Sequence, residues 1–154
     1  MKLVRLLIAA CAVLALCGVS AAAAKAPAFV PKPGAYAGTA KADGKTVPVT
    51  GAVVKQGNKY LVQVLLTATM TCDDGTQLQA GVGIPATLKG KTFSATESGK
   101  DSSTGGTATF KVSGRFSSAK AFSGTGSKDL SAGSLQPQLG ACSTGTISFS
   151  LSKK

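Results

Sequence analysis

Apolar and polar side chains alternate along most of the chain after the first thirty or so residues. The alternation is clearest over 60–72, where the apolar positions are Tyr60, Val62, Val64, Leu66, Ala68, Met70 and Cys72. Leu61 and Leu65 are the exceptions. A period of two is typical of a β-strand with one buried face, whereas a helix would scatter these side chains around its circumference. The pattern therefore predicts a long, half-buried strand.

The same alternation recurs in shorter segments. It predicts further strands over 77–84, 107–116 and 146–152, and weaker ones over 35–40, 46–54, 91–97 and 119–126. Turn-forming residues separate the strands at Asp43-Gly44, Gln56-Gly57-Asn58, Asp73-Asp74-Gly75, Lys89-Gly90 and Ser117-Ser118. Two longer loops, rich in Gly and Ser, are expected over 98–106 and 127–141.

We therefore expect residues 34–152 to form one all-β domain. About eight short strands joined by tight turns indicate an antiparallel meander, closed as a small barrel or folded as a sandwich. Each strand has a single apolar face, so the sheet must cover itself. Large aromatic side chains are few, and Tyr36, Tyr60 and the phenylalanines would supply most of the bulk of the core.

Residues 1–24 have the features of a signal peptide. Lys2 and Arg5 precede an apolar run over 6–16, and small residues lead up to a cleavage site before Lys25. An uncleaved membrane anchor is the alternative, because 3–24 is long enough to span a bilayer. Lipoprotein processing is disfavoured, since neither of the two cysteines in this segment follows a suitable lipidation box. We expect a secreted or periplasmic protein with no membrane span after cleavage.

The processed chain would begin with a proline-rich leader over 25–33 and would keep two cysteines, Cys72 and Cys142. In an oxidising compartment these predict one disulfide, which would be worth about 4 kcal/mol for so long a loop. A pair of free thiols or a metal site without histidine is the less favoured alternative. Cys142 is out of step with the alternation of the last strand, so we expect it before that strand, with Gly145 breaking the register.

Composition argues against an enzyme. The chain has no histidine and only 6 acidic residues, which excludes Ser-His-Asp triads and histidine-ligated zinc and leaves little for paired-carboxylate chemistry. Asp73-Asp74-Gly75, with Asp101 or Asp129, could contribute to a calcium site, but a hairpin turn is the favoured interpretation. Ser117 and Lys120 have S-x-x-K spacing, but in a predicted turn instead of a helix start. We expect no catalytic residues, no metal and no cofactor.

The charge is the most informative surface feature. Lysine and arginine number 17, giving a formal net charge of +11. Several basic side chains could converge on one end of the sheet, and the candidate anion-binding residues are Lys89, Lys91, Lys111, Arg115 and Lys120. The competing interpretation, which the sequence slightly favours, is that scattered lysines keep the surface soluble and protect edge strands. A single arginine after the signal segment argues against dedicated nucleic-acid recognition.

Short motifs mark the opening and the end of the domain. They are Gly34-Ala35-Tyr36-Ala37-Gly38-Thr39, Thr71-Cys72, Gly90-Lys91-Thr92-Phe93, Gly114-Arg115-Phe116 and Cys142-Ser143-Thr144-Gly145. Together they resemble a loose group of small secreted bacterial all-β proteins of uncharacterised function, in which a G-x-Y-x-G-T opening precedes two cysteines and a C-x-x-G closing strand. The last strand here lacks the tryptophan associated with that ending. The resemblance covers nearly all of 34–152 and implies the fold and export, but no activity.

Three functions fit these observations. The first is a monomeric, non-catalytic binding module of the cell envelope, whose partner is an anionic envelope polymer or another exported protein. The second is a carrier of a small apolar ligand inside a closed barrel, resembling avidins or lipocalins. The third is a secreted protease inhibitor whose leader, 25–33, enters a protease cleft.

Overall fold

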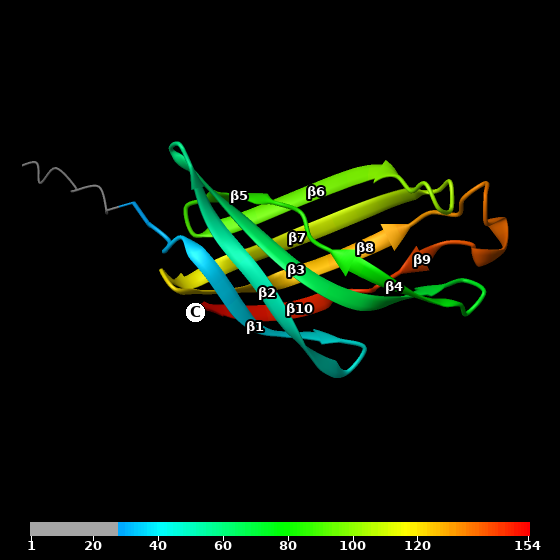
Figure 1. Ribbon diagram of the computed structural model, residues 1–154, viewed down its shortest axis with the longest axis horizontal. Helices are drawn as coiled ribbons and strands as arrows, with labels where there is room; N and C mark the ends of the chain where they lie inside the picture. Colours follow the sequence, from blue (N-terminus) through cyan, green and yellow to red (C-terminus); the bar gives the residue numbers. More distant parts are fainter. Residues whose placement is uncertain (1–27) are drawn as a thin grey trace, which may run out of the picture.

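The computed structural model describes residues 28–154, and over that range the chain is almost entirely β-structure (Figure 1). The strands are β1 Gly34–Ala42, β2 Lys45–Gln56, β3 Lys59–Cys72, β4 Gln77–Val82, β5 Ala86–Lys89, β6 Thr92–Lys100, β7 Thr107–Ser118, β8 Ala121–Leu130, β9 Cys142–Ser143 and β10 Ile147–Lys153. One 3₁₀ turn, η1 Pro137–Leu139, precedes β9. The predicted all-β class is confirmed.

The strands form one antiparallel sheet that closes on itself. Neighbours pair in the order β10-β1-β2-β3-β5-β6-β7-β8, and β8 pairs with β10 to complete a ring. β4 lies outside this ring and pairs with the second half of β3. β9 pairs with the end of β3 on one side and with the end of β8 on the other. The predicted meander closed on itself is therefore confirmed.

β3 follows the alternation that predicts it. Its even-numbered positions from Val62 to Cys72 are buried, and Tyr60 is partly buried against the same core. Of the two exceptions in the pattern, Leu65 is 51% exposed on the outer face. The strand is long enough to pair with β5 near its start and with β4 and β9 near its end.

The structure corrects several predicted boundaries. Residues 98–100 belong to β6 and residues 127–130 to β8, so the two long loops shorten to 101–106 and 131–141. The turn predicted at Ser117-Ser118 lies at 119–120, because a register shift between Phe116 and Ser118 lets β7 continue two residues further. β5 and β9 were not expected. They are short, and each is held by pairing with strands on both sides.

Aromatic rings fill the interior of the ring. Phe122 contacts Tyr36, Phe93, Phe116 and Phe149, with centroid separations from 5.0 to 6.4 Å. Glycines make room for two of these rings. Phe93, Gly114, Gly124 and Phe149 are successive register partners across β6, β7, β8 and β10, so each ring lies beside a residue without a side chain. A Cβ on Gly124 would lie 2.8 Å from Cζ of Phe149. Any larger residue in place of Gly124 would therefore have to displace the Phe149 ring.

A second, smaller core lies beyond the ring. It is enclosed by β4, the end of β3, the start of β7 and the end of β8. Its buried members are Met70, Cys72, Ala80, Ala108, Leu130, Leu139 and Cys142. Cys72 and Cys142 are direct partners across β3 and β9 and form a disulfide. The predicted pairing is confirmed, as is the expectation that Cys142 precedes the last strand. Gly145 has φ +61° between β9 and β10, a conformation that glycine adopts without strain.

Residues 28–33, the part of the predicted leader that the structure describes, cover one end of the ring. Pro31 is buried, and the Phe29 ring lies 5.5 Å from that of Phe116. The Tyr36 hydroxyl donates to the carbonyl oxygens of Lys32 at 2.6 Å and Ala119 at 3.2 Å. The Lys32 amide also donates to the Ala119 carbonyl. The segment has no helix or strand of its own and packs against the domain.

The predicted signal peptide, 1–24, and the first leader residues, 25–27, lie outside the described residues. Between residues 28 and 154 there is no helix long and apolar enough to cross a membrane.

Candidate functional site

Alternate connections of the meander lie at the same end of the ring. The turns at 57–58, 90–91 and 119–120 share one end with residues 28–33 and with the chain's C-terminus (Figure 1). The turns at 43–44 and 73–75 and the loops 101–106 and 131–141 lie toward the other end, together with the disulfide. This division of the turns follows from antiparallel pairing. It also places most of the cationic side chains at one end and the acidic side chains in the other half.

The first of these ends, which we call the basic end, carries most of the positive charge. Its cationic residues are Lys32, Lys55, Lys59, Lys89, Lys91, Arg115, Lys120, Lys153 and Lys154. All 6 acidic residues of the chain lie in the other half, on the opposite turns and loops or on the distal parts of β6 and β8. They are Asp43, Asp73, Asp74, Glu97, Asp101 and Asp129. The molecule therefore has a strongly asymmetric charge distribution.

Four of the five predicted anion-binding residues lie at the basic end. Lys89 and Lys91 flank the β5–β6 turn, Lys120 is in the β7–β8 turn, and Arg115 is the register partner of Thr92, beside Lys91. The fifth, Lys111, is nearer the start of β7 and so lies farther from the basic end. Its Nζ is 3.7 Å from Oδ2 of Asp129, so it faces a carboxylate and stands apart from the other four.

A shallow cleft of about 750 Å³ runs along the outer surface beside this end. Lys59 and Lys89 line it from β3 and β5, two strands that pair at Leu61 with Thr87 and at Val62 with Ala86. The hydroxyl-bearing residues of the cleft are Thr87, Thr92, Ser94 and Ser113. No acidic residue lines it. Ammonium groups beside hydroxyl donors suit the oxygens of a phosphate, sulfate or carboxylate group.

The packing of the leader adds to the positive surface. Nζ of Lys91 lies 5.4 Å from the centre of the Phe29 ring, and Nζ of Lys153 donates to the Pro33 carbonyl at 3.0 Å. Neither ammonium group lies within 4.0 Å of a carboxylate oxygen, since the ion pair found among residues 28–154 joins Lys111 to Asp129. Their charge is therefore available to an external anion.

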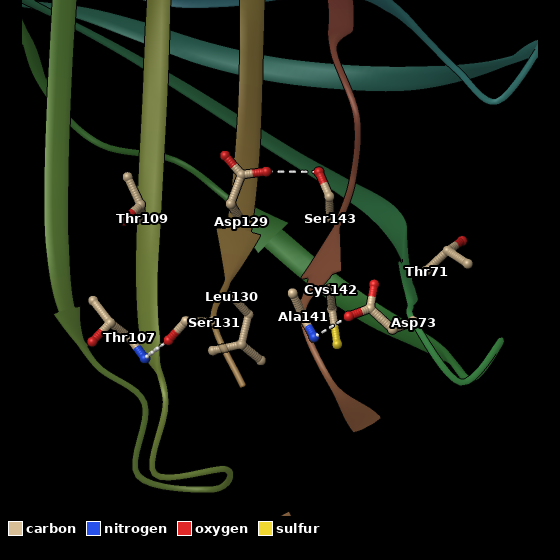
Figure 2. Close-up of a pocket in the computed structure, with 10 residues that line it drawn as sticks. All are labelled: Thr71, Asp73, Thr107, Thr109, Asp129, Leu130, Ser131, Ala141, Cys142 and Ser143. Carbon is tan, nitrogen blue, oxygen red and sulfur yellow. Dashed lines mark hydrogen bonds between the residues drawn. The ribbon is translucent and has the colours of Figure 1, made fainter. Parts of the chain in front are cut away.

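A second depression, of about 470 Å³, lies at the opposite end and is lined in part by Ala141, Cys142 and Ser143 (Figure 2). Its carboxylates are already engaged. Asp129 accepts a hydrogen bond from the Ser143 hydroxyl at 2.6 Å, and Asp73 accepts one from the Ala141 amide at 2.8 Å (Figure 2). These bonds hold β9 against β8 and against the β3–β4 turn. The depression is thus better explained as a structural junction than as a reactive site.

The other chemistry considered from the sequence has structural explanations as well. Asp74 accepts hydrogen bonds from the amide and hydroxyl of Thr76 in the β3–β4 turn. Asp101 accepts hydrogen bonds from Ser103 and Thr104 in loop 101–106, and these bonds, the one from the Ser103 hydroxyl foremost, lower the pKa of its carboxyl. Across residues 28–154 no three His, Cys, Asp or Glu side chains gather in a way that could hold a metal ion. The Ser117 hydroxyl donates to the Ala121 carbonyl at 3.3 Å, so the serine of the S-x-x-K spacing bonds across the β7–β8 turn.

Five cations of the basic end are not among the candidate anion-binding residues. Two of them, Lys55 and Lys59, flank the β2–β3 turn. The other three are Lys32, Lys153 and Lys154. They come from the two ends of the described chain, which meet there: the Lys154 amide donates to the Ala35 carbonyl at 3.2 Å. The alternating direction of antiparallel strands could have predicted this position. In such a sheet every second turn lies at one end of the ring, and the first strand starts and the last strand finishes at that same end.

Comparison of the chain with protein-family models, curated proteins and solved structures gives no match.

Proposed function

We propose that this protein is an exported, non-catalytic binding module that attaches to an anionic component of the cell envelope through its basic end. The observation that carries the proposal is the segregation of charge: the basic end groups cations from both chain ends and three separate turns, while the acidic residues all lie elsewhere. A positive potential over one end attracts polyanions and orients them on approach.

The competing explanation, that lysines serve only solubility, accounts less well for this arrangement. Solubility is best served by charges of both signs interspersed over the surface. Here Lys59 and Lys89 line one cleft that has no acidic residue, and repulsion between like charges costs stability. A site for an anion would offset this cost, so the arrangement fits a binding role.

Two features support a site outside the cytoplasm and a role without catalysis. The signal-like segment and the disulfide between Cys72 and Cys142 fit an oxidising compartment. The carboxylates of the second depression are bound to neighbouring groups and face no histidine, since the chain has none. The interior is filled by aromatic rings and residues 28–33 pack on their own domain, so no observation favours the carrier or the protease inhibitor.

The test compares two double variants of equal net charge. We expect Lys59→Gln/Lys89→Gln to bind inorganic polyphosphate at least tenfold more weakly than the unaltered protein, as measured by titration at low and moderate salt. Lys41→Gln/Lys45→Gln, at the opposite end, should bind within about twofold of it and show the same decline with salt. Equal weakening of both variants would contradict a localised site. Absence of salt-sensitive binding both to polyphosphate and to anionic lipid vesicles would contradict the proposal itself.

A further inference from the structure

We infer that the anionic component is a bilayer surface rich in acidic phospholipids, and that the basic end lies flat against it. This inference rests on the proposed function and names the partner of the same site. Three independent features of the described residues favour a membrane plane over a soluble polymer: the spread of the cations, the apolar side chains among them, and the point at which the chain enters the domain.

The cations are spread over the whole end and are not aligned along a groove. They come from β2, the start of β3, the β5–β6 turn, β7, the β7–β8 turn, residue 32 and the C-terminus. Of these, only Lys59 and Lys89 line the cleft. A polymer strand would contact one line of such charges at a time, whereas a plane of phosphate groups can contact several turns together. Each lysine or arginine close to an acidic bilayer adds about 1 kcal/mol to binding.

Exposed apolar side chains accompany the cations. Four large hydrophobic residues of the described chain are strongly exposed, and two of them, Val30 and Val54, lie at or beside the basic end with 58% and 51% of their surface accessible. Val30 lies between Phe29 and Pro31, which are both packed against the ring, so its side chain is held outward at a fixed place. Apolar side chains within a cationic surface are typical of proteins that rest in the headgroup region.

The chain reaches the domain through the same end. Residue 28, the first described, precedes the segment that crosses the basic end, so all upstream residues connect there. With cleavage before Lys25, the new α-amino group and Lys25 would add positive charge within a few residues of Ala28. With the apolar run 6–16 retained, the anchor would pull this end toward the bilayer. Either form presents the same face to a membrane.

The experiment uses the protein purified from the exported fraction, with sedimentation of vesicles as the measurement. We expect it to sediment with vesicles that contain phosphatidylglycerol and to stay in solution with vesicles of phosphatidylcholine alone. Lys59→Gln/Lys89→Gln should weaken vesicle binding about thirtyfold. Lys41→Gln/Lys45→Gln, which removes the same charge from the other end, should leave it nearly unchanged.

A second pair of variants separates a bilayer from a soluble polyanion. Val30→Ser should weaken binding to the acidic vesicles about fivefold, because insertion of its side chain is lost, and should leave polyphosphate binding unchanged. Leu135→Ser, which alters an exposed apolar residue at the opposite end, should change neither.

The outcomes distinguish the inference from the function on which it rests. Binding to polyphosphate without binding to acidic vesicles would overturn the bilayer inference and leave the proposed function standing. Equal sedimentation with both kinds of vesicle, or equal effects of Val30→Ser on vesicles and polyphosphate, would also overturn it. If the protein binds neither polyphosphate nor acidic vesicles, both proposals are overturned.

Discussion

Gly114 faces the interior of the ring beside the Phe93 ring, and a Cβ at this position would lie 2.6 Å from the Ser123 carbonyl oxygen. The backbone of the paired strand cannot move away without loss of the β7–β8 hydrogen bonds. We therefore expect Gly114→Ala to lower the free energy of unfolding by about 1–3 kcal/mol, as measured by urea denaturation.

The matched control for this prediction is Gly81→Ala. Gly81 is also within a strand, but a Cβ there would meet nothing within 4 Å. That substitution should leave stability unchanged or raise it slightly, because alanine loses less backbone entropy than glycine. If both substitutions cost the same, tight packing around Gly114 is not the cause.

Tyr36 gives the protein a sensitivity to alkaline conditions. Its side chain is 1% exposed and its hydroxyl donates to two carbonyl oxygens, and burial raises the pKa of the phenol above its usual value. A raised pKa in the folded state means that the protonated phenol contributes stability below the unfolded pKa of about 10. This contribution is lost as the pH rises through the folded pKa.

The measurement is the free energy of unfolding as a function of pH for the unaltered protein and for Tyr36→Phe. We expect the variant to be less stable near neutral pH by about 1 kcal/mol, since the Lys32 carbonyl loses the Tyr36 hydroxyl as donor, whereas the Ala119 carbonyl still accepts from the Lys32 amide. Above about pH 10 the difference in stability should shrink. In the unaltered protein the buried phenol then keeps its proton at a cost in free energy that Tyr36→Phe does not have. A difference that stays constant across this range would argue against a buried, proton-retaining hydroxyl.

Among the elements, β9 depends most on covalent support. It has only two residues, and it joins β3 to β8 through paired backbone groups and the disulfide, which spans 70 residues of chain. We expect Cys72→Ala/Cys142→Ala to lower the free energy of unfolding by about 4 kcal/mol. Urea denaturation of this variant, and of the unaltered protein with and without reductant, measures the loss.

Binding provides the control for the disulfide prediction. The disulfide is at the end opposite the basic residues, so the folded double variant should bind polyphosphate as the unaltered protein does. A parallel loss of binding in the folded variant would contradict the separation of structural support from the site.

The alternation of side chains predicts the strands that bury a full apolar face, and β3, β7 and β10 are its best examples. It fails where pairing continues without such a face. In β8, Lys128 points inward and its Nζ lies 5.0 Å from the centre of the Phe110 ring, so a lysine occupies a position that the pattern assigns to an apolar residue. At the end of β6, residues 98–100 pair with β7 although all three are exposed. Both segments therefore resemble loops in the sequence.

The candidate site was predictable in part. The sequence indicates an excess of cations and suggests that some converge, and the structure brings Lys89, Lys91, Arg115 and Lys120 to one end. Lys111 lies on β7, as Arg115 does, yet it is farther from the basic end, and the pairing of β7 with β8 places Asp129 beside it. Contacts between strands far apart in the sequence decide such details, and periodicity within one segment does not contain them.

At the scale of the whole molecule, the separation of charge should make stability depend on salt. Repulsion among the lysines of the basic end opposes folding, and dissolved ions screen it within about 10 Å at moderate ionic strength. We expect the Tm to rise when salt is added at neutral pH, as measured by calorimetry, and to rise less for Lys59→Gln/Lys89→Gln. A Tm that falls with salt would indicate that favourable ion pairs outweigh this repulsion.

The two ends of the described chain meet beside β1, where Lys153 is the register partner of Tyr36 and the Lys154 amide donates to Ala35. The order of the strands in space therefore does not depend on where the polypeptide starts. A circular permutant that joins Lys154 to the leader through a short linker, and opens the chain in loop 101–106, should adopt the same ring. In such a permutant the new termini would emerge at the acidic end, and a fluorescent label or an immobilisation tag attached there would leave the basic end unobstructed.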